Sequence, residues 1–248
     1  MWKWGLIAGS SLVVATATAA PDACDGFGFL EGSLTIDEGD FSMSGDAAND
    51  FFGRSMLTAD INGDGSPDVV VGAPGADAMG LDSGGAYIFY GPFGDLSALS
   101  PATADVTINA TGQYDYLGWT LSPVGDLDLD GYPDVVIGAP ANPSSGFPAG
   151  YALLINGGPS LPAVIAAEDA DAVFMGGTAG DQFGFSVANV LDMNGDGFND
   201  VAVGAPGNDQ SANNAGAVFV FPGPISGTLF ADEADAVITG PTSGALTG

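Results

Sequence analysis

The same acidic loop occurs three times in this chain, at a constant spacing of 66 residues. Each copy has the pattern Asp-x-(Asp/Asn)-x-Asp-Gly-x-x-Asp, and the copies begin at Asp60, Asp126 and Asp192. Each copy leads into a run rich in β-branched residues that ends in Gly-Ala-Pro. A fixed period of this length indicates repeated copies of one supersecondary unit, as in an array or a propeller.

Four short strands are expected in each unit, because apolar runs bounded by Gly and Pro recur in phase with the loops. In the second unit they fall at 117–121, 134–138, 150–155 and 172–175, and Gly85–Tyr90 and Gly216–Phe221 repeat the third of them. No segment has a helical period. The predicted fold class is therefore all-β, a β-propeller of three complete four-stranded blades with partial units at both ends, as a fragment of a larger ring.

The chain is expected to divide into a secretory signal peptide at 1–20 and a propeller segment at 21–248. Residues Leu6–Ala19 form an apolar run, too short for a comfortable membrane span, and small residues at its end suit cleavage. No transmembrane span is expected in the mature chain. The repeats are expected at approximately 46–110, 111–176 and 177–240.

Both ends of the propeller segment carry partial units. Residues 32–45 match residues 227–240 in pattern, and Asp235–Gly248 matches Asp171–Gly184. Three complete units fall short of the usual 4–8 blades of a ring, so unpaired strand edges should remain. We expect such a chain alone to be either marginally folded or self-associated through these open blade edges.

Charge excludes several functions. The chain has 31 Asp and Glu, 2 Lys and Arg and no His, which gives a net charge of −29. This charge repels phosphate backbones, so we expect no nucleic-acid partner, and it disfavours anionic membranes. Without His, nucleophilic catalysis of the Ser-His or Cys-His kind is excluded. The single Cys24 follows the expected signal, where either lipid modification or a free thiol is compatible with the sequence.

The loop pattern predicts a site for a hard divalent cation. Carboxylate or amide side chains at positions one, three and five project toward one centre, and the glycine at position six permits a sharp turn. Position seven varies because it offers its carbonyl oxygen, and the Asp at position nine closes the shell. Calcium takes six to eight oxygen ligands in flexible geometry, so it fits better than magnesium or zinc.

An EF-hand is excluded despite the shared opening of its loop. An EF-hand needs a bidentate Glu at position twelve and flanking helices. Position twelve is instead occupied by Val71, Ile137 or Val203, inside an expected strand.

An acidic loop between a Phe-Gly pair and a Gly-Ala-Pro resembles the FG-GAP repeats of the integrin α-chain β-propeller. The Phe-Gly pairs are Phe52-Gly53 and Phe183-Gly184, and the second unit departs from the motif with Leu117-Gly118. The resemblance implies a propeller whose loops bind calcium and which serves adhesion or ligand binding. It also implies about three calcium ions, one in each loop.

The ligands implied by this resemblance occupy the same five positions of every loop. They are Asp60, Asn62, Asp64, Ser66 and Asp68; Asp126, Asp128, Asp130, Tyr132 and Asp134; and Asp192, Asn194, Asp196, Phe198 and Asp200. The phenylalanines Phe52, Phe89, Phe183 and Phe219 are expected in the blade cores and not in a ligand platform.

The leading functional hypothesis is a secreted or surface-displayed calcium-binding module for adhesion, or for binding an extracellular protein or glycan. The alternative is a non-catalytic propeller that belongs to a larger extracellular hydrolase or lyase. A purely structural module of a longer surface protein is a third hypothesis. No acid outside the loops breaks the repeat as a catalytic residue should, so no enzymatic activity is expected within this chain.

Overall fold

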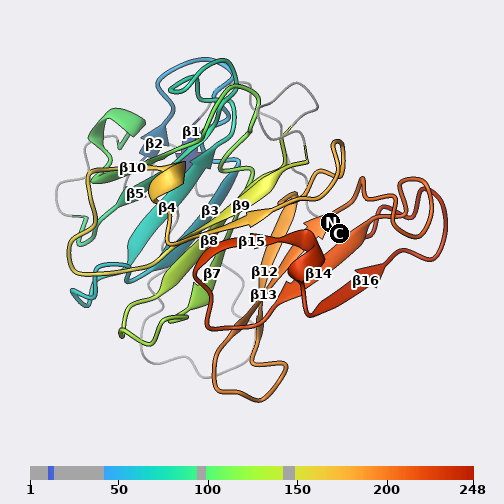
Figure 1. Ribbon diagram of the computed structural model, residues 1–248. Coiled ribbons are helices and arrows are strands. Elements are labelled where there is room, and N and C mark those ends of the chain that lie inside the picture. The colour runs from blue at the N-terminus through green and yellow to red at the C-terminus, as the bar shows by residue number, and fades with distance from the viewer. Residues whose placement is uncertain (1–10, 14–41, 94–98, 142–148) are drawn as a thin grey trace, which may run out of the picture.

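The computed structural model describes residues 11–13, 42–93, 99–141 and 149–248, and these residues form strands joined by turns and short 3-10 helices (Figure 1). Three sheets contain four or five strands each. The predicted all-β architecture is confirmed, and the arrangement is that of a partial β-propeller. No helix among the described residues is long and apolar enough to cross a membrane.

Each of these three sheets contains four antiparallel strands that form one blade. The first blade is β3 (Ser55–Ala59), β4 (Asp68–Ala73), β5 (Gly85–Phe89) and β6 (Val106–Asn109). The second is β7 (Thr120–Gly125), β8 (Asp134–Ala139), β9 (Tyr151–Ile155) and β11 (Ala172–Met175). The third is β12 (Ser186–Leu191), β13 (Asp200–Ala205), β14 (Ala217–Phe221) and β16 (Ala236–Thr239).

A fifth strand, which the sequence did not predict, covers the outer edge of the first two blades. Strand β10 (Val164–Ala166) pairs in parallel with β6, and β15 (Gly227–Phe230) pairs in parallel with β11. Each covering strand leads into a 3-10 turn, η3 (Ala167–Asp169) or η4 (Ala231–Glu233), and a third such turn is η2 (Pro101–Thr103). Successive blades are therefore joined by backbone hydrogen bonds as well as by packing.

The core lies between the blades, so the second strand of each blade is buried on both faces. In β4, Val70 contributes to the core between blades one and two, while Val69 and Val71 contribute to the core on the other side of blade one. Burial on both faces explains the continuous β-branched runs that precede Gly-Ala-Pro. The expected blade-core phenylalanines Phe52, Phe89, Phe183 and Phe219 are all buried.

The first strand of blade two begins later than expected. The sequence predicted a strand at 117–121, whereas β7 begins at Thr120. Leu117 instead makes an isolated bridge to Gly84, and Gly118 has a φ of +85°, which interrupts the extended backbone. Leu117 is fully buried, so it keeps the apolar role of the Phe that it replaces.

β-Bulges in the first strands of blades two and three account for an unequal sequence spacing between the Phe-Gly motif and the acidic loop. The apolar residue at the Phe position of the Phe-Gly motif precedes the first Asp of the loop by eight residues in the first unit and by nine in the other two. The extra residue is Val124 in β7 and Val190 in β12, where the pairing register shifts, whereas β3 pairs with β4 without a shift. The bulges therefore keep all three loops at equivalent places despite the insertion.

The glycines of the two motifs allow neighbouring blades to approach closely. The Gly118 amide donates to the Gly138 carbonyl within its own blade at 3.1 Å. A Cβ on Gly138 would lie 2.1 Å from the carbonyl oxygen of Gly184, the Phe-Gly glycine of the next unit. Gly72 has the same relation to Gly118. Phe-Gly and Gly-Ala-Pro thus meet across each interface between blades, where no side chain fits.

Two short strands precede the first blade: β1 (Ser11–Val13) pairs with β2 (Ser42–Ser44). The expected signal peptide at 1–20 lies outside the described residues except for β1. Cys24 and the repeated segment that begins at residue 32 lie outside them as well, apart from its end from residue 42 onward.

Candidate calcium loops

Each acidic loop connects the first two strands of a blade, between β3 and β4, β7 and β8, or β12 and β13. Position nine is the first residue of the second strand, so the sheet ladder fixes Asp68, Asp134 and Asp200 directly. The other loop residues precede this strand and are held by hydrogen bonds within the loop. The three loops follow one pattern, which makes them copies in structure as well as in sequence.

The position-nine carboxylates are buried and accept hydrogen bonds from the backbone on both oxygens. In blade one, Asp68 Oδ2 accepts from the Ile61 amide at 2.7 Å, and Oδ1 accepts from the Gly91 amide at 2.9 Å. The same two bonds recur at Asp134 from Leu127 and Gly157, and at Asp200 from Met193 and Gly223. Each carboxylate therefore ties the start of the loop to the residues that follow the third strand.

Burial changes the titration of Asp134 and Asp68. Desolvation raises the pKa of Asp134 to about 6, although backbone amides of Leu127 and Gly157 oppose the shift. Desolvation likewise raises the pKa of Asp68. A bound cation would favour the ionised form of both groups and so oppose this effect of burial.

The remaining acids turn inward over the loop backbone. In loop one, Asp60 Oδ2 accepts from the Gly65 amide at 3.0 Å, and Asp64 Oδ1 accepts from the Ser66 amide at 2.7 Å. Asn62 Oδ1 accepts from the Asp64 amide at 3.0 Å. Equivalent bonds form in the other two loops, with Asp126, Asp128 and Asp130 and with Asp192, Asn194 and Asp196 as acceptors. The amides thus gather the side chains of positions one, three and five around each loop.

Left-handed backbone conformations make these turns possible. The position-six glycines Gly65, Gly131 and Gly197 have φ values of +87°, +97° and +96°, as the sequence reasoning for that position requires. Position four is also left-handed, and there the loops differ. It is glycine in loops one and three, but loop two has Leu129, with a φ of +62° and an exposed side chain.

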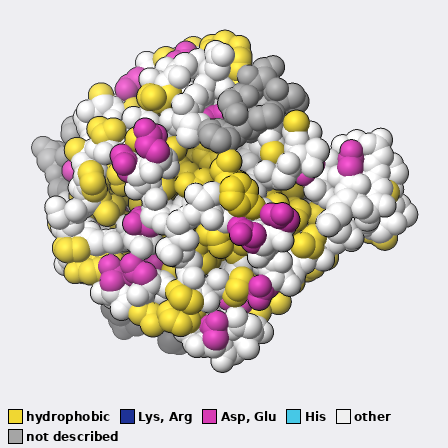
Figure 2. Space-filling view, in the orientation of Figure 1, with side chains coloured by type: hydrophobic (Ala, Val, Ile, Leu, Met, Phe, Trp, Pro, Cys, Tyr) yellow, Lys and Arg dark blue, Asp and Glu magenta, His cyan; other side chains and the backbone are white. Residues whose placement is uncertain are grey.

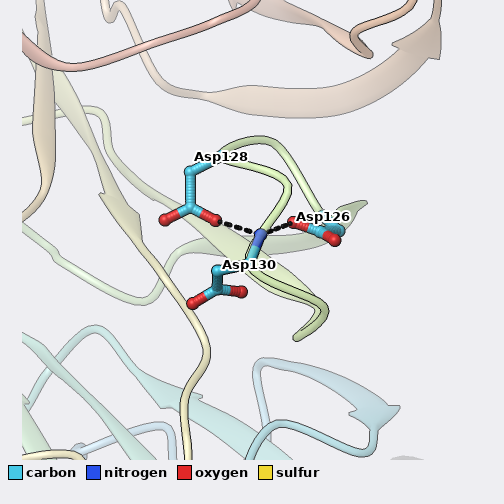
Figure 3. Close-up of side chains that lie close together, drawn as sticks. All are labelled: Asp126, Asp128 and Asp130. Carbon is cyan, nitrogen blue, oxygen red and sulfur yellow. Dashed lines mark hydrogen bonds between the residues drawn. The ribbon is translucent and has the colours of Figure 1, made fainter.

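Loop two carries the densest acidic cluster. Carboxylate oxygens of Asp126, Asp128 and Asp130 lie within 4.8 Å of one another, a grouping that could hold a metal ion. The Asp130 amide lies between the other two carboxylates and donates to Asp126 at 3.0 Å and to Asp128 at 3.1 Å (Figure 3). Desolvation raises the pKa of Asp128, and the charges of Asp130 and Asp126 add to the rise.

A side chain outside the loop supports this cluster, and the sequence did not point to it. Asn156 Nδ2 donates to Asp128 Oδ2 at 2.7 Å. In the other loops, position three is an amide whose Nδ2 donates to the position-five acid, from Asn62 at 3.2 Å and from Asn194 at 2.8 Å. Asn156 therefore supplies to loop two an amide donor that its neighbours carry inside the loop.

The donor set fits a hard cation. All predicted ligand atoms are oxygens, which calcium prefers, and the chain contains no His. Asp60 Oδ1 is a buried carboxylate oxygen with no hydrogen-bond partner. An orphaned anionic oxygen is costly unless a donor or a cation compensates for it. The position-nine carboxylates retain lone pairs beyond their two backbone bonds, so they too can bind a cation.

A row of side chains immediately before the first strands, one exposed and two half-buried, lies outside the metal loops and was also missed by the sequence reasoning. The residue after each Phe-Gly glycine is Arg54, Trp119 or Phe185. Arg54 lies over the Trp119 ring at 4.5 Å from its centroid, and the Trp119 and Phe185 centroids are 5.5 Å apart. Their shared position after the glycine was the available signal.

Three blades that each carry an acidic loop after a Phe-Gly position define a repeat protein of the propeller class. Comparison with known proteins agrees with this class. The family model for the FG-GAP repeat matches residues 52–89, 117–155 and 183–221, so this chain is an FG-GAP repeat protein. Each match runs from the Phe-Gly position through the acidic loop to the end of the third strand.

Among curated proteins, the chain is similar to integrin α chains. It is 33% identical to human Integrin alpha-IIb over 175 residues, which is 68% of this chain and 16% of the relative. Human Integrin alpha-7 is 34% identical over 66% of this chain and 13% of its own length, and Integrin alpha-PS5 of Drosophila melanogaster is 33% identical over 66% and 16%. The chain thus matches less than one-fifth of the length of these relatives.

Proposed function

We propose that this chain is a calcium-binding FG-GAP propeller segment that acts in adhesion, or in binding a protein or glycan, outside the cell or at its surface. The observation that carries the proposal is the common hydrogen-bond pattern of the three acidic loops, on blades similar in sequence to integrin α chains. Each loop would bind one calcium ion through the five positions predicted from the sequence.

Calcium would act mainly on the loops themselves. Each loop gathers three or four carboxylates, and Arg54 is the only basic residue among those that the structure describes. A cation bound only by the folded chain stabilises it by about 2.7 kcal/mol per site at a hundredfold excess over Kd. The ions would thus hold the edge of each blade in the conformation that a partner meets.

The acidic surface is consistent with this proposal. On the face shown in Figure 2, acidic side chains surround apolar patches, and no Lys or Arg is visible among the described residues. Such a surface favours an uncharged or cationic partner, or one bridged by calcium. Nucleic acid remains excluded by charge.

The proposal is tested by binding to arrays of glycans and extracellular proteins in calcium or in chelator. The critical variant combines Asp64→Ala, Asp130→Ala and Asp196→Ala, one position-five acid from each loop. The matched control combines Asp46→Asn, Glu168→Gln and Asp232→Asn, three exposed acids outside the loops.

We expect wild type and control to bind a common partner in calcium, and the loop variant to lose that binding. Binding that persists in chelator and in the loop variant would contradict a role for calcium. Absence of any partner in calcium would contradict the adhesion function, whereas calcium titration of the same samples tests the metal sites separately.

A further inference from the structure

A short segment after the third strand of blade two contacts both loop one and loop two. This bridging segment consists of residues 156–158. On the side of loop two, Asn156 Nδ2 donates to Asp128 at 2.7 Å, and the Gly157 amide donates to Asp134 at 2.9 Å. Both acceptors are predicted calcium ligands, so the position of the bridging segment depends on the conformation of loop two.

The last residue of the bridging segment contacts loop one. The Gly158 amide donates to the Ile61 carbonyl at 2.9 Å. Ile61 lies between the predicted ligands Asp60 and Asn62. Its own amide donates to the buried Asp68 at 2.7 Å. A shift of the bridging segment would therefore move the backbone that holds three predicted ligands of loop one.

Close packing joins the same two loops. The ring of Tyr132, at position seven of loop two, lies on Gly63, at position four of loop one, where an added Cβ would be 2.4 Å from the ring. Gly157 lies equally close to both loops. A Cβ on it would be 2.4 Å from the Pro133 carbonyl oxygen and 2.9 Å from the Ile61 carbonyl oxygen. Loops one and two therefore cannot move independently at this contact.

The backbone hydrogen bond cannot recur between loops two and three. The residue equivalent to Gly158 is Pro224, which has no amide hydrogen. The carbonyl equivalent to that of Ile61 belongs to Leu127, so it receives no bond from this position. Leu127 and Ile61 are both 1% exposed, so burial of the side chain is common to the two pairs of loops. The hydrogen bond is what distinguishes them.

The ring packing of Tyr132 cannot recur between loops two and three either. Loop two has Leu129 at position four, and a Cβ at the equivalent place in loop one would collide with the ring. Asn189 and Asn199 of blade three instead donate to the Val124 carbonyl, at 3.0 and 2.9 Å. Val124 belongs to β7 and is fully buried, so these bonds attach blade three to the sheet and not to the ligands of loop two.

We propose that the bridging segment and Tyr132 couple loops one and two, so that filling either loop raises the calcium affinity of the other, while loop three binds without such coupling. The inference rests on the proposed calcium function of the loops. A loop that is ordered by its ion also orders the contacts it shares with its neighbour, so the second loop has less freedom left to lose on binding. The coupling free energy acts equally in both directions.

Chains with one or two functional loops measure the coupling. Asp64→Ala, Asp130→Ala and Asp196→Ala each disable one loop, and combining two of them leaves a single loop. Calorimetry in about 0.15 M salt, which screens repulsion between the ions, gives the association constants of every chain. The coupling factor is the product of the two constants in a two-loop chain divided by the product for the matching single-loop chains. It should be about fivefold or more for loops one and two, and near one for the other pairs.

Variants that break the bridge keep every predicted ligand. Asn156→Ala removes the donor to Asp128, and Tyr132→Ala removes the ring but retains the carbonyl oxygen predicted to bind calcium. Each should lower the coupling factor of loops one and two toward one. The matched control Phe198→Ala changes the equivalent residue of loop three and should leave this factor unchanged. Since the factor is a ratio, a changed affinity of one loop alone does not alter it.

Amide hydrogen exchange by NMR provides a second readout. In the chain with Asp64→Ala and Asp196→Ala, only loop two can bind calcium. Adding calcium should slow exchange of the Gly158 amide, which donates to loop one, and should leave the Gly223 amide of blade three unchanged.

Two kinds of failure are distinguishable in these experiments. Calcium binding by all three single-loop chains with a factor near one for loops one and two would overturn the coupling alone. Unchanged factors in both bridge variants, or unchanged exchange at Gly158, would also overturn it. Absence of calcium binding in every single-loop chain would overturn the proposed calcium function and the coupling with it.

Discussion

Leu129 should be a point of backbone strain in the second loop. Its φ of +62° places a γ-branched side chain in the left-handed region, where the equivalent residues Gly63 and Gly195 have φ values of +70° and +81°. The left-handed conformation costs a non-glycine residue about 1–2 kcal/mol. Replacement by glycine relieves this cost but adds about 0.5–1 kcal/mol of chain entropy in the unfolded state.

The net prediction is that Leu129→Gly stabilises the chain by about 0.5–1 kcal/mol. The side chain is 61% exposed, so its removal leaves no cavity to offset the gain. For a chain of this size, such a change raises Tm by about 1–4 °C.

The reciprocal change provides the control. A Cβ on Gly195 would meet no atom within 4 Å, so Gly195→Leu introduces the same backbone cost without a clash at the Cβ. It should destabilise the chain by about 1 kcal/mol. Urea unfolding in chelator measures both variants without a contribution from metal. A loss of stability in Leu129→Gly, or no change in either variant, would refute the assignment of strain.

Three further predictions concern the loops and the interfaces between blades. Asp128→Asn should lower the calcium affinity of loop two toward that of its neighbours, since it removes a carboxylate that they lack; calorimetry that finds the affinity unchanged would show that charge count does not tune these sites. Gly138→Ala should destabilise the chain by about 2 kcal/mol or more, because the added Cβ would lie 2.1 Å from the Gly184 carbonyl oxygen. In the control Gly177→Ala, the added Cβ would meet no atom within 4 Å, so the urea midpoint should stay almost unchanged. Burial raises the pKa of Asp134 to about 6, so the folded chain in chelator binds a proton at this carboxylate more tightly than the unfolded chain does. The free energy of unfolding should therefore fall as pH rises from about 4 to 6. A urea midpoint that increases over this pH window would be contrary evidence.

Much of the fold could be predicted from local patterns. The repeat period, the strands that flank each loop and the buried Phe-Gly side chains depend on residues close in sequence. Gly65 and its counterparts adopt the left-handed turn that the loop pattern requires. The family comparison confirms the FG-GAP repeats, while the individual calcium ligands stay a prediction.

The features that were missed depend on contacts between distant residues. Asn156 reaches Asp128 from 28 positions away, after the third strand, and nothing in the loop pattern points to it. The covering strands β10 and β15 are short and pair in parallel with another blade, so no alternation within the segment reveals them. The bulge at Val124 becomes visible only when β7 is paired with β8, although the spacing of the motifs contained the extra residue.

Calcium stoichiometry tests the central claim most directly. Isothermal calorimetry of the metal-free chain, with bound metal measured independently by atomic emission, should give about three calcium ions per chain, because each of three equivalent loops supplies its own set of oxygens. The variant with Asp64→Ala, Asp130→Ala and Asp196→Ala should lose this binding, and the control with three exposed acids changed outside the loops should keep it. A stoichiometry near zero in millimolar calcium, or equal binding by both variants, would contradict the account.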